Sequence, residues 1–172
     1  MLFMGEEYGE QRPFPFFCSF GNPGLIEAVR QGRRREFENL AFNWQIELPD
    51  PQDPLTFNSA RLSWDWPEGS WQAGLRQLYQ DLLAARREWP ELAARGSHET
   101  HPVAADVVDG RILHVRRGQV TELDVWANLS DHPWPLPPEA LVGRRVRCSS
   151  CLQRYGGERE SLQSIHQLEP YE

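Results

Sequence analysis

The segment Val103–Arg116 reads VAADVVDGRILHVR and decides how the second half of the chain folds. A run rich in β-branched residues lies on each side of Asp109-Gly110. Asp-Gly between two such runs is a strong signal for a tight β-hairpin, because both turn positions tolerate a positive φ. The sequence therefore predicts two antiparallel strands joined at this dipeptide.

Two further short runs of the same texture follow the hairpin. They lie at residues 120–129 and 144–148, on either side of a proline-rich stretch at 133–138. Several short strands separated by turn residues are typical of all-β domains. The chain after residue 96 is therefore expected to form an antiparallel sheet or a small antiparallel β-sandwich domain over residues 96–172.

A helix is expected upstream, starting at Asn22-Pro23. Asparagine is a good N-cap and proline is favoured at the first helical position. The helix should continue to about Leu40, and Gly32 weakens its centre. Its apolar residues predict an inward face made of Leu25, Ile26, Val29 and Phe37.

A second helix is expected from Ser70 to Trp89, ended by Pro90. Between the two helices, residues 48–67 are rich in Pro, Asp and Trp and predict an irregular segment folded onto a neighbour. The second helix has leucine and tyrosine at the spacing of one helical face. These residues are Leu75, Leu78, Tyr79, Leu82 and Leu83.

The first four residues, Met1–Met4, form an unbroken apolar run. A run without alternation is typical of a strand buried on both faces of a parallel sheet. Parallel strands pair only through long crossover connections, so the partners of such a strand would be distant in the chain. The start of the chain is therefore expected to be part of a larger α/β structure.

Composition excludes several classes of function. The 172-residue chain carries a net charge of −7, which disfavours non-specific nucleic-acid binding. All 18 basic residues are arginine, so no lysine is present for Schiff-base chemistry, a phosphate loop or a pyridoxal cofactor. No apolar run has the length of a membrane helix and the acidic start is unlike a signal peptide. We expect a cytoplasmic protein without nucleic-acid or membrane partners.

Three carboxylates, Glu6, Glu7 and Glu10, follow the first apolar run. Glycoside hydrolysis uses a pair of carboxyl groups, so one of them could be a catalyst. Adjacent side chains on an extended segment point to opposite sides, which argues against Glu6 and Glu7 acting together. A supporting or substrate contact, and simple capping of the loop, are the two other interpretations.

Cys148-Ser-Ser-Cys151 has the spacing of half a zinc site or of a redox pair. Zinc needs a second pair of ligands, and Cys18 is the third and last cysteine of the chain. A redox pair opens a helix, whereas this one ends an expected strand. Two ordinary reduced thiols are the favoured interpretation, and neither a metal nor a cofactor is expected.

Two further clusters each allow two interpretations. The arginines of residues 30–35 form ion pairs on the helix surface, or they dock against an acidic neighbouring segment. The tryptophans of residues 64–71 stack on sugar rings, or they form a buried cluster between domains. The tryptophans are Trp64, Trp66 and Trp71.

Five blocks of sequence together resemble the malto-oligosyltrehalose trehalohydrolase family, a branch of the α-amylase superfamily. The match covers residues 1 to about 92, and the β-rich remainder resembles the family's C-terminal domain more loosely. The third and fourth blocks make the match specific, because glucan branching enzymes share a segment like the first. The blocks are FMGEEYGE (3–10), PFPFF (13–17), EAVRQGRRREF (27–37), PDPQDPLTF (49–57) and SARLSW (59–64).

The resemblance implies that residues 1–95 are the C-terminal end of a (β/α)8 catalytic barrel. Leu2–Met4 would be its last strand and residues 71–89 its closing helix. Family members hydrolyse the α-1,4 bond next to the terminal trehalose unit of malto-oligosyltrehalose and release trehalose. Their catalytic carboxylates precede the matched region, so the isolated fragment is expected to be inactive.

The residues expected to bind substrate lie at the carboxyl end of this barrel strand, where barrel enzymes bind their ligands. They are Glu6, Glu7, Tyr8, Phe14 and Phe16. Two alternatives remain for the function: the tail of a glucan branching enzyme, and a stand-alone carbohydrate-binding or interaction domain.

Overall fold

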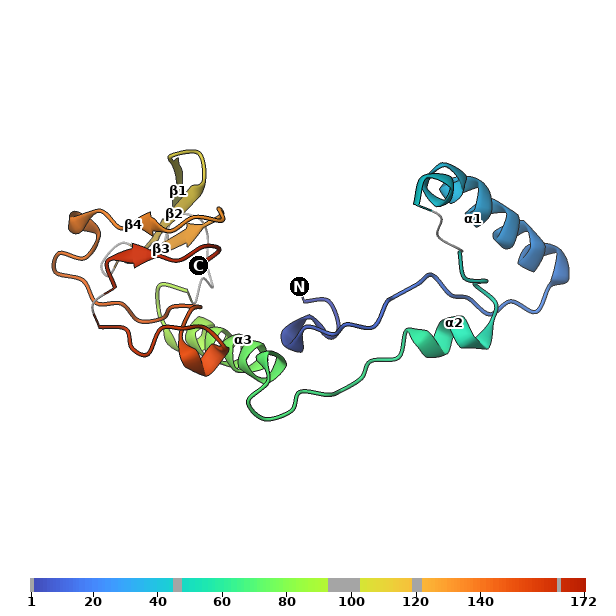
Figure 1. Ribbon diagram of the computed structural model, residues 1–172, viewed down its shortest axis with the longest axis horizontal. Helices are drawn as coiled ribbons and strands as arrows, with labels where there is room; N and C mark the ends of the chain where they lie inside the picture. The colour runs from blue at the N-terminus through green and yellow to red at the C-terminus, as the bar shows by residue number, and fades with distance from the viewer. Residues whose placement is uncertain (1, 45–47, 93–102, 119–121, 164) are drawn as a thin grey trace. The chain divides into compact units, whose positions relative to one another are not determined.

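A computed structural model of the protein describes residues 2–44, 48–92, 103–118, 122–163 and 165–172 (Figure 1). By their contacts these residues form two compact units, Met1–Asp65 and Trp66–Glu172. In chain order the elements are η1 (Glu6–Tyr8), α1 (Pro23–Trp44), α2 (Pro54–Ser59), α3 (Trp71–Glu88), β1 (Val103–Val108), β2 (Ile112–Arg117), β3 (Leu123–Asn128), β4 (Trp134–Pro135), η2 (Pro138–Ala140), η3 (Gln153–Tyr155) and β5 (Gln167–Leu168).

The second unit contains the predicted hairpin. Strands β1 and β2 pair antiparallel, with Val108 opposite Ile112, and β3 continues the sheet on the other side of β2. Asp109 and Gly110 have φ of 52° and 69°, the conformation that a type I′ turn requires at both central positions. The hairpin and the antiparallel sheet are therefore confirmed.

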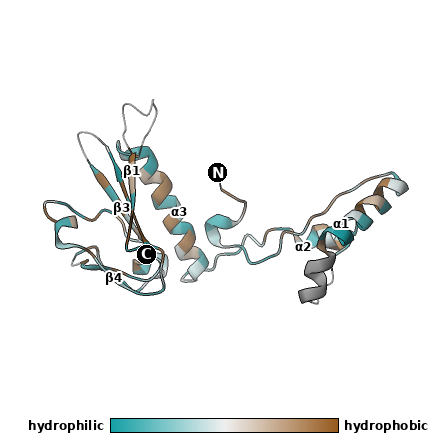
Figure 2. Cartoon of the chain, turned by 90° about the horizontal axis from the view of Figure 1, so that it is seen from above, coloured by the Kyte–Doolittle hydropathy of each residue, from teal (hydrophilic) through white to brown (hydrophobic). Residues whose placement is uncertain are grey.

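Helix α3 has the limits that the sequence predicts. The Ser70 hydroxyl accepts a hydrogen bond from the Ala73 N–H at 3.2 Å and caps the helix, which ends before Pro90. Hydrophobic and hydrophilic residues alternate along the ribbon of α3 (Figure 2). Gly74 lies against the Tyr155 backbone of η3, so closely that a Cβ there would be 2.6 Å from the Tyr155 carbonyl.

The apolar core of the second unit lies between the sheet, η3 and the C-terminal segment. Ile112 is fully buried at the start of β2. Buried aliphatic surface is the main source of stability in such a unit, at about 25 cal/mol per Å². The other buried hydrophobic residues of this unit are Ala85, Leu152, Tyr155, Ile165 and Leu168.

A second, two-stranded sheet pairs β4 with β5 antiparallel, with Trp134 opposite Leu168. The predicted strand at 144–148 is wrong, because these residues form an irregular segment. The side chains of Arg144 and Arg147 form ion pairs with Glu122 and Glu91. The backbone N–H of Arg144 donates to the Leu141 carbonyl, which closes a turn just before this segment. The finer expectation of a β-sandwich stays a prediction.

In the first unit, α1 begins where the sequence predicts. The Asn22 side chain accepts hydrogen bonds from the N–H groups of Gly24 and Leu25 at 2.9 and 3.1 Å. Leu25 is 45% exposed, so its predicted inward position is wrong, while Ile26 is partly covered. An N-cap acts within one turn of its own residue, whereas burial depends on what the rest of the fold places against the helix.

The segment 48–67 is less irregular than expected, because α2 lies within it. Asp53 caps this short helix by accepting from the Leu55 N–H at 2.8 Å, and Pro54 occupies the first helical position. The buried Thr56 donates its hydroxyl to the Asp50 carbonyl at 2.7 Å. This cap has the same chemistry as that of α1 and could have been found in the sequence.

The predicted strand Leu2–Met4 is wrong for this structure. These residues are irregular and lead into a turn and η1, with Phe3 58% exposed. A parallel strand exists only with hydrogen-bonded neighbours, and the described strands are used in the antiparallel sheets of the second unit.

The predicted boundary at 95–101 lies outside the described residues. Helix α3 contacts η3 and belongs by its contacts to the second unit, whereas the resemblance assigns it to the end of a barrel. The assignment of residues 1–95 to a barrel and 96–172 to a β domain stays a prediction. Within the described residues, no helix combines the length and the apolar character needed to cross a bilayer.

Candidate functional site

Glu6 and Glu7 lie on the 3-10 helix η1. This helix is the start of the predicted substrate loop, residues 6–17. In a 3-10 helix successive side chains are about 120° apart, so the expected alternation of an extended segment is wrong. The Glu6 carboxylate accepts from the Phe3 N–H at 2.8 Å and is otherwise exposed. Glu7 is half-buried.

Tyr8, the third predicted substrate residue, is 1% exposed. Its hydroxyl donates to Glu10 Oε2 at 3.1 Å, and its ring lies 6.2 Å from that of Trp64. Burial is the largest cause of its raised pKa, to which the neighbouring Glu10 carboxylate adds. Tyr8 therefore packs inside the first unit, and its role toward a substrate stays a prediction.

Glu10 is the third of the carboxylates that follow the first apolar run, and it is held by the largest number of hydrogen bonds described for the three. Its two oxygens accept hydrogen bonds from Tyr8, from the Arg12 N–H at 2.9 Å and from the Ser63 N–H. Desolvation alone would raise the pKa of Glu10, but the hydrogen bonds from Ser63, Arg12 and Tyr8 together lower it to about 2.

Phenylalanines of the predicted substrate loop belong to a continuous aromatic cluster. Phe14 makes edge-to-face contacts with Phe3 and Phe17, at centroid distances of 5.4 and 5.9 Å. Phe17 continues the contact to Phe57 at 5.2 Å. Phe14 is 48% exposed, so part of its apolar surface is open to a ligand.

Phe16 is the second exposed ring of the loop, and α1 holds it in place. The Arg33 guanidinium lies 4.8 Å from the Phe16 ring and 4.5 Å from the Phe37 ring, within cation–π range. Arg33 also pairs with Glu36 at 2.8 Å. One face of the Phe16 ring is therefore in contact with a cation, while 48% of the residue remains exposed.

Both interpretations of the arginine cluster are realised. Arg33 forms an ion pair on its own helix, whereas Arg30 binds Asp50 of the neighbouring segment at 2.7 Å. Hydrogen bonding to Asp50 is the largest cause of the raised pKa of Arg30. The Arg30–Asp50 contact ties α1 to the segment before α2.

The three tryptophans divide between the two units. In the first unit Trp64, 64% exposed, lies against Tyr8. In the second unit the Arg76 guanidinium lies 4.7 Å from the Trp66 ring, and Trp71 is exposed at the first position of α3. Both interpretations of these tryptophans stay predictions.

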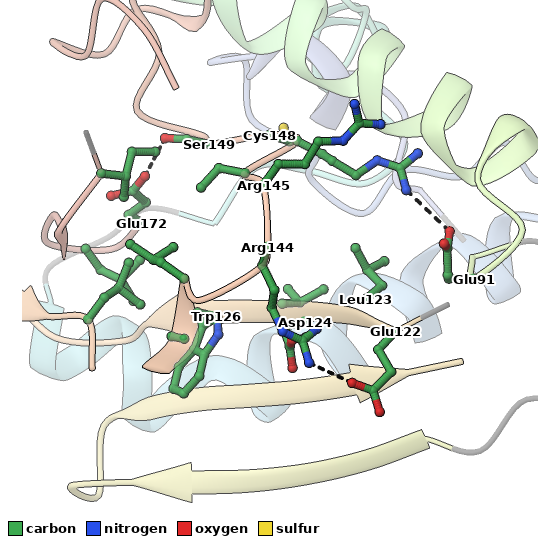
Figure 3. Close-up of a pocket in the computed structure, with 18 of the residues that line it drawn as sticks. Glu91, Glu122, Leu123, Asp124, Trp126, Arg144, Arg145, Cys148, Ser149 and Glu172 are labelled. Carbon is green, nitrogen blue, oxygen red and sulfur yellow. Dashed lines mark hydrogen bonds and ion pairs between the residues drawn. The ribbon is translucent and has the colours of Figure 1, made fainter. Parts of the chain in front are cut away.

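A pocket of about 1040 Å³ lies in the second unit, between α3, β3 and the segment 140–150 (Figure 3). On one side Arg144 binds Glu122 at 2.6 Å and also pairs with Asp124. On the other, Arg147 binds Glu91 and lies 3.7 Å from the Trp89 ring. Sequence reasoning missed this pocket, since its walls come from segments far apart in the chain.

Trp126 lines the same pocket from β3. Its ring stacks on His114 at 3.7 Å, and His114 Nε2 lies 2.8 Å from Asp124. Its contact with Trp134 is looser, at 5.8 Å. Several polar groups around the pocket thus pair with one another, namely Arg144 with Glu122 and Asp124, Arg147 with Glu91, and His114 with Asp124.

Cys148 also lines this pocket, and Cys151 follows it on the same segment. Both thiols are free, and burial raises the pKa of each. A raised pKa keeps a thiol protonated and unreactive. Among the described residues, no group of three or more His, Cys, Asp or Glu side chains is placed to hold a metal ion.

Comparison with characterised proteins bears on the family. A malto-oligosyltrehalose trehalohydrolase of Rhizobium sp. is 42% identical over 144 residues, which is 83% of this chain and 23% of that protein. The enzyme of the same name from Arthrobacter ramosus is 48% identical over 90 residues, 52% of this chain and 16% of that protein. The chain thus spans less than a quarter of the length of these relatives. No protein-family model matches it.

A solved structure agrees with these relatives. A crystal structure from Salmonella typhimurium, described as a candidate alpha amylase, has a TM-score of 0.61 and 32% identity with this chain. The match covers 78% of this chain and 22% of that one. The resemblance to malto-oligosyltrehalose trehalohydrolases inferred from the motifs is therefore confirmed, together with an α-amylase-like fold relationship.

Proposed function

We propose, from the 39–48% identity with malto-oligosyltrehalose trehalohydrolases, that this chain is the C-terminal part of a trehalose-releasing glycosidase. The complete protein would hydrolyse the α-1,4 bond next to the terminal trehalose unit of malto-oligosyltrehalose. Its place would be in carbohydrate metabolism, in trehalose biosynthesis. The homology is the observation that carries this proposal.

The exposed apolar start of the chain supports a place within a longer fold. Leu2, Phe3 and Met4 are each about half exposed, with Phe3 at 58%. Soluble proteins rarely leave such contiguous apolar surface uncovered. We assign residues 1–95 to the end of a (β/α)8 barrel, whose other strands and helices would cover these side chains.

Glu6 and Glu10 are poorly suited to be the acid catalyst. A general acid of a glycosidase needs a raised pKa, whereas Glu10 has a lowered one and receives three hydrogen bonds. Glu6 is used to accept from a backbone N–H. In keeping with the family resemblance, the catalytic carboxylates are assigned to the rest of the complete protein, and the isolated chain should be inactive.

Substrate contact is assigned to residues 6–17, the predicted substrate loop that begins with η1. Glu7 offers a half-buried carboxylate, and Phe14 and Phe16 offer half-exposed rings. Phe14 is in edge-to-face contact with Phe3, and the Arg33 guanidinium lies over one face of Phe16. Carboxylates bind sugar hydroxyls and flat rings bind the apolar face of a glucose unit. This combination suits an oligosaccharide.

The test uses a chimera that carries residues 1–92 of this chain in place of the homologous segment of the Arthrobacter relative. Glu7→Gln and Phe16→Ala are introduced separately, with Glu68→Gln on the exposed surface as the matched control. We expect at least one loop variant to lose about 10-fold or more in kcat/KM on maltotriosyltrehalose, which is about 1.4 kcal/mol. The control should keep its activity.

Trehalose release by the isolated 172-residue chain, lost on Glu6→Gln or Glu7→Gln, would contradict the assignment of catalysis to the rest of the protein. Unchanged kinetics in both loop variants would make the loop purely structural. Formation of branched glucan by the chimera would favour the branching-enzyme alternative.

We also propose a cytoplasmic location. The three cysteines of the chain are free, as is typical of proteins in reducing compartments. Fractionation of the source cells, with the protein detected by antibody, tests this directly.

A further inference from the structure

We propose that Glu10 is a positioning residue: its carboxylate fastens the substrate loop to the segment Arg61–Trp64 and so sets where Glu7 and the exposed phenylalanines lie. The inference rests on the proposed function for the role of the loop. It goes further by assigning the geometry of that loop to one side chain, which itself need not touch the substrate.

The first step is the hydrogen-bond network of Glu10. Within the loop, its carboxylate accepts from the Tyr8 hydroxyl and the Arg12 N–H, at 3.1 and 2.9 Å. Across 53 residues of sequence, it accepts from the Ser63 N–H. One carboxylate therefore joins both sides of the loop to a distant part of the chain.

A second connection reinforces the first. The Arg12 guanidinium donates to the Arg61 carbonyl at 2.9 Å, and the Tyr8 ring packs on Trp64. Trp64 has a positive φ of 53°, which turns the chain at this contact. The loop and the segment 61–64 are thus joined by polar and aromatic contacts of Glu10 and of its two hydrogen-bond partners within the loop, Tyr8 and Arg12.

The backbone is shaped to admit the Glu10 side chain. Gly5 has a φ of 85°, and a Cβ at this position would be 2.7 Å from Glu10 Cβ and 3.1 Å from Leu62 Cδ2. Only glycine adopts this conformation at little cost and leaves room for the side chain. The Gly5 carbonyl also accepts the Glu10 N–H at 2.9 Å.

The network requires a carboxylate and not an amide. Both oxygens of Glu10 face backbone N–H groups, that of Arg12 on one side and that of Ser63 on the other. In a glutamine one of these oxygens becomes an NH₂ group, which then faces an N–H donor in either orientation. Glu10→Gln therefore disrupts the network with almost no change in side-chain volume.

The first experiment measures the loop itself. Amide hydrogen exchange is recorded on the chimera described above, which supplies the contacts that the first unit lacks by itself, as the unsubstituted protein, Glu10→Gln and the surface control Glu68→Gln. We expect the Ser63 and Arg12 amides to exchange about 10-fold or more faster in Glu10→Gln alone, since exchange reports local opening. Equal protection in all three proteins overturns the proposal.

The second experiment measures the consequence for catalysis in the chimera described above. Glu10→Gln should lower kcat/KM on maltotriosyltrehalose by about 10-fold or more, with a change in kcat as well as in KM, because small displacements of contact groups weaken transition-state binding. Glu68→Gln should leave both constants unchanged.

The outcomes separate the two proposals. Faster exchange at Ser63 with unchanged kcat and KM overturns the positioning role and leaves the proposed function standing. A wild-type chimera that releases no trehalose contradicts the proposed function, and the exchange of the Ser63 amide then decides by itself whether Glu10 holds the loop.

Discussion

In the first unit the carboxylates of Glu10 and Asp50 hold segments together, whereas in the second unit buried aliphatic side chains do so. Ile112 is fully buried and Leu168 is 6% exposed in the second unit. Tyr8 is the one hydrophobic residue of the described first unit that reaches comparable burial. The first unit therefore depends on polar contacts around uncovered aromatic surface.

This difference indicates which of the two units has an apolar core of its own. A unit with its own apolar core can fold independently, whereas one that exposes Leu2, Phe3 and Phe57 depends on contacts supplied from elsewhere. The second unit is accordingly expected to unfold cooperatively, and the first to gain order within the complete protein. The following substitutions test this contrast, beginning with the largest effect.

The core of the second unit is tested by Ile112→Ala. We expect a loss of about 2–5 kcal/mol in the free energy of unfolding, because the site is fully buried and truncation leaves a cavity. Val107→Ala on the exposed face of the same sheet is the control and should cost about 0.5 kcal/mol or less. Denaturant unfolding followed by amide exchange measures both; a loss that spreads equally into the first unit would contradict the division.

Removing one partner of an ion pair should likewise cost more stability in the second unit than in the first. Glu172 is 6% exposed at its side chain and binds Arg159 at 2.7 Å, so Glu172→Gln should cost about 2–3 kcal/mol. The Arg30–Asp50 pair is about one-third exposed, and Asp50→Asn should cost less than about 1 kcal/mol. Urea titrations of both variants give the comparison. Equal losses would show that burial does not distinguish these pairs.

Replacing glycine by alanine should have opposite effects on stability in the two long helices, α3 and α1. Gly74→Ala in α3 places a methyl group 2.6 Å from the Tyr155 carbonyl and should destabilise by about 1–3 kcal/mol. Gly32→Ala in α1 meets nothing within 4 Å and should stabilise that helix by about 0.5–1 kcal/mol. Circular dichroism during thermal unfolding measures both changes. Stabilisation by Gly74→Ala would refute the close contact between α3 and η3.

Acid should loosen the first unit through Glu10. The pKa of Glu10 is lowered from 4.5 to about 2, so the folded state binds fewer protons than the unfolded state. Its contribution to stability is therefore complete above pH 4.5 and is lost as the pH falls toward 2. In NMR titrations the Ser63 and Arg12 amides should shift with a midpoint near 2. Glu10→Gln should abolish this transition; if it persists, another group causes it.

Local elements could largely be predicted. The caps Asn22 and Ser70, the stop at Pro90 and the Asp109-Gly110 hairpin all form as expected. Each depends on side-chain and backbone chemistry within a few residues. The family resemblance was equally readable, because its motifs are contiguous blocks.

Burial and pairing could not be predicted in the same way. Leu25 is exposed on a helix face that the pattern predicts to be inward, and Leu2–Met4 form no strand. An apolar pattern states which residues favour burial, but a neighbouring element has to cover them. The segment 144–148 has strand-forming residues but no strand to pair with among the described residues.

By itself, the sequence determined where helices and turns begin and end, and which family the chain resembles, because these follow from residues adjacent in the chain. Only the tertiary structure decided that the Glu10 carboxylate accepts from the Ser63 N–H and so joins the loop of residues 6–17 to a distant segment. These two residues are separated by 53 positions, and no local preference brings them together. The contact forms because the folded backbone places the Ser63 N–H beside the Glu10 carboxylate, where it replaces hydrogen bonds to water that the carboxylate loses on folding.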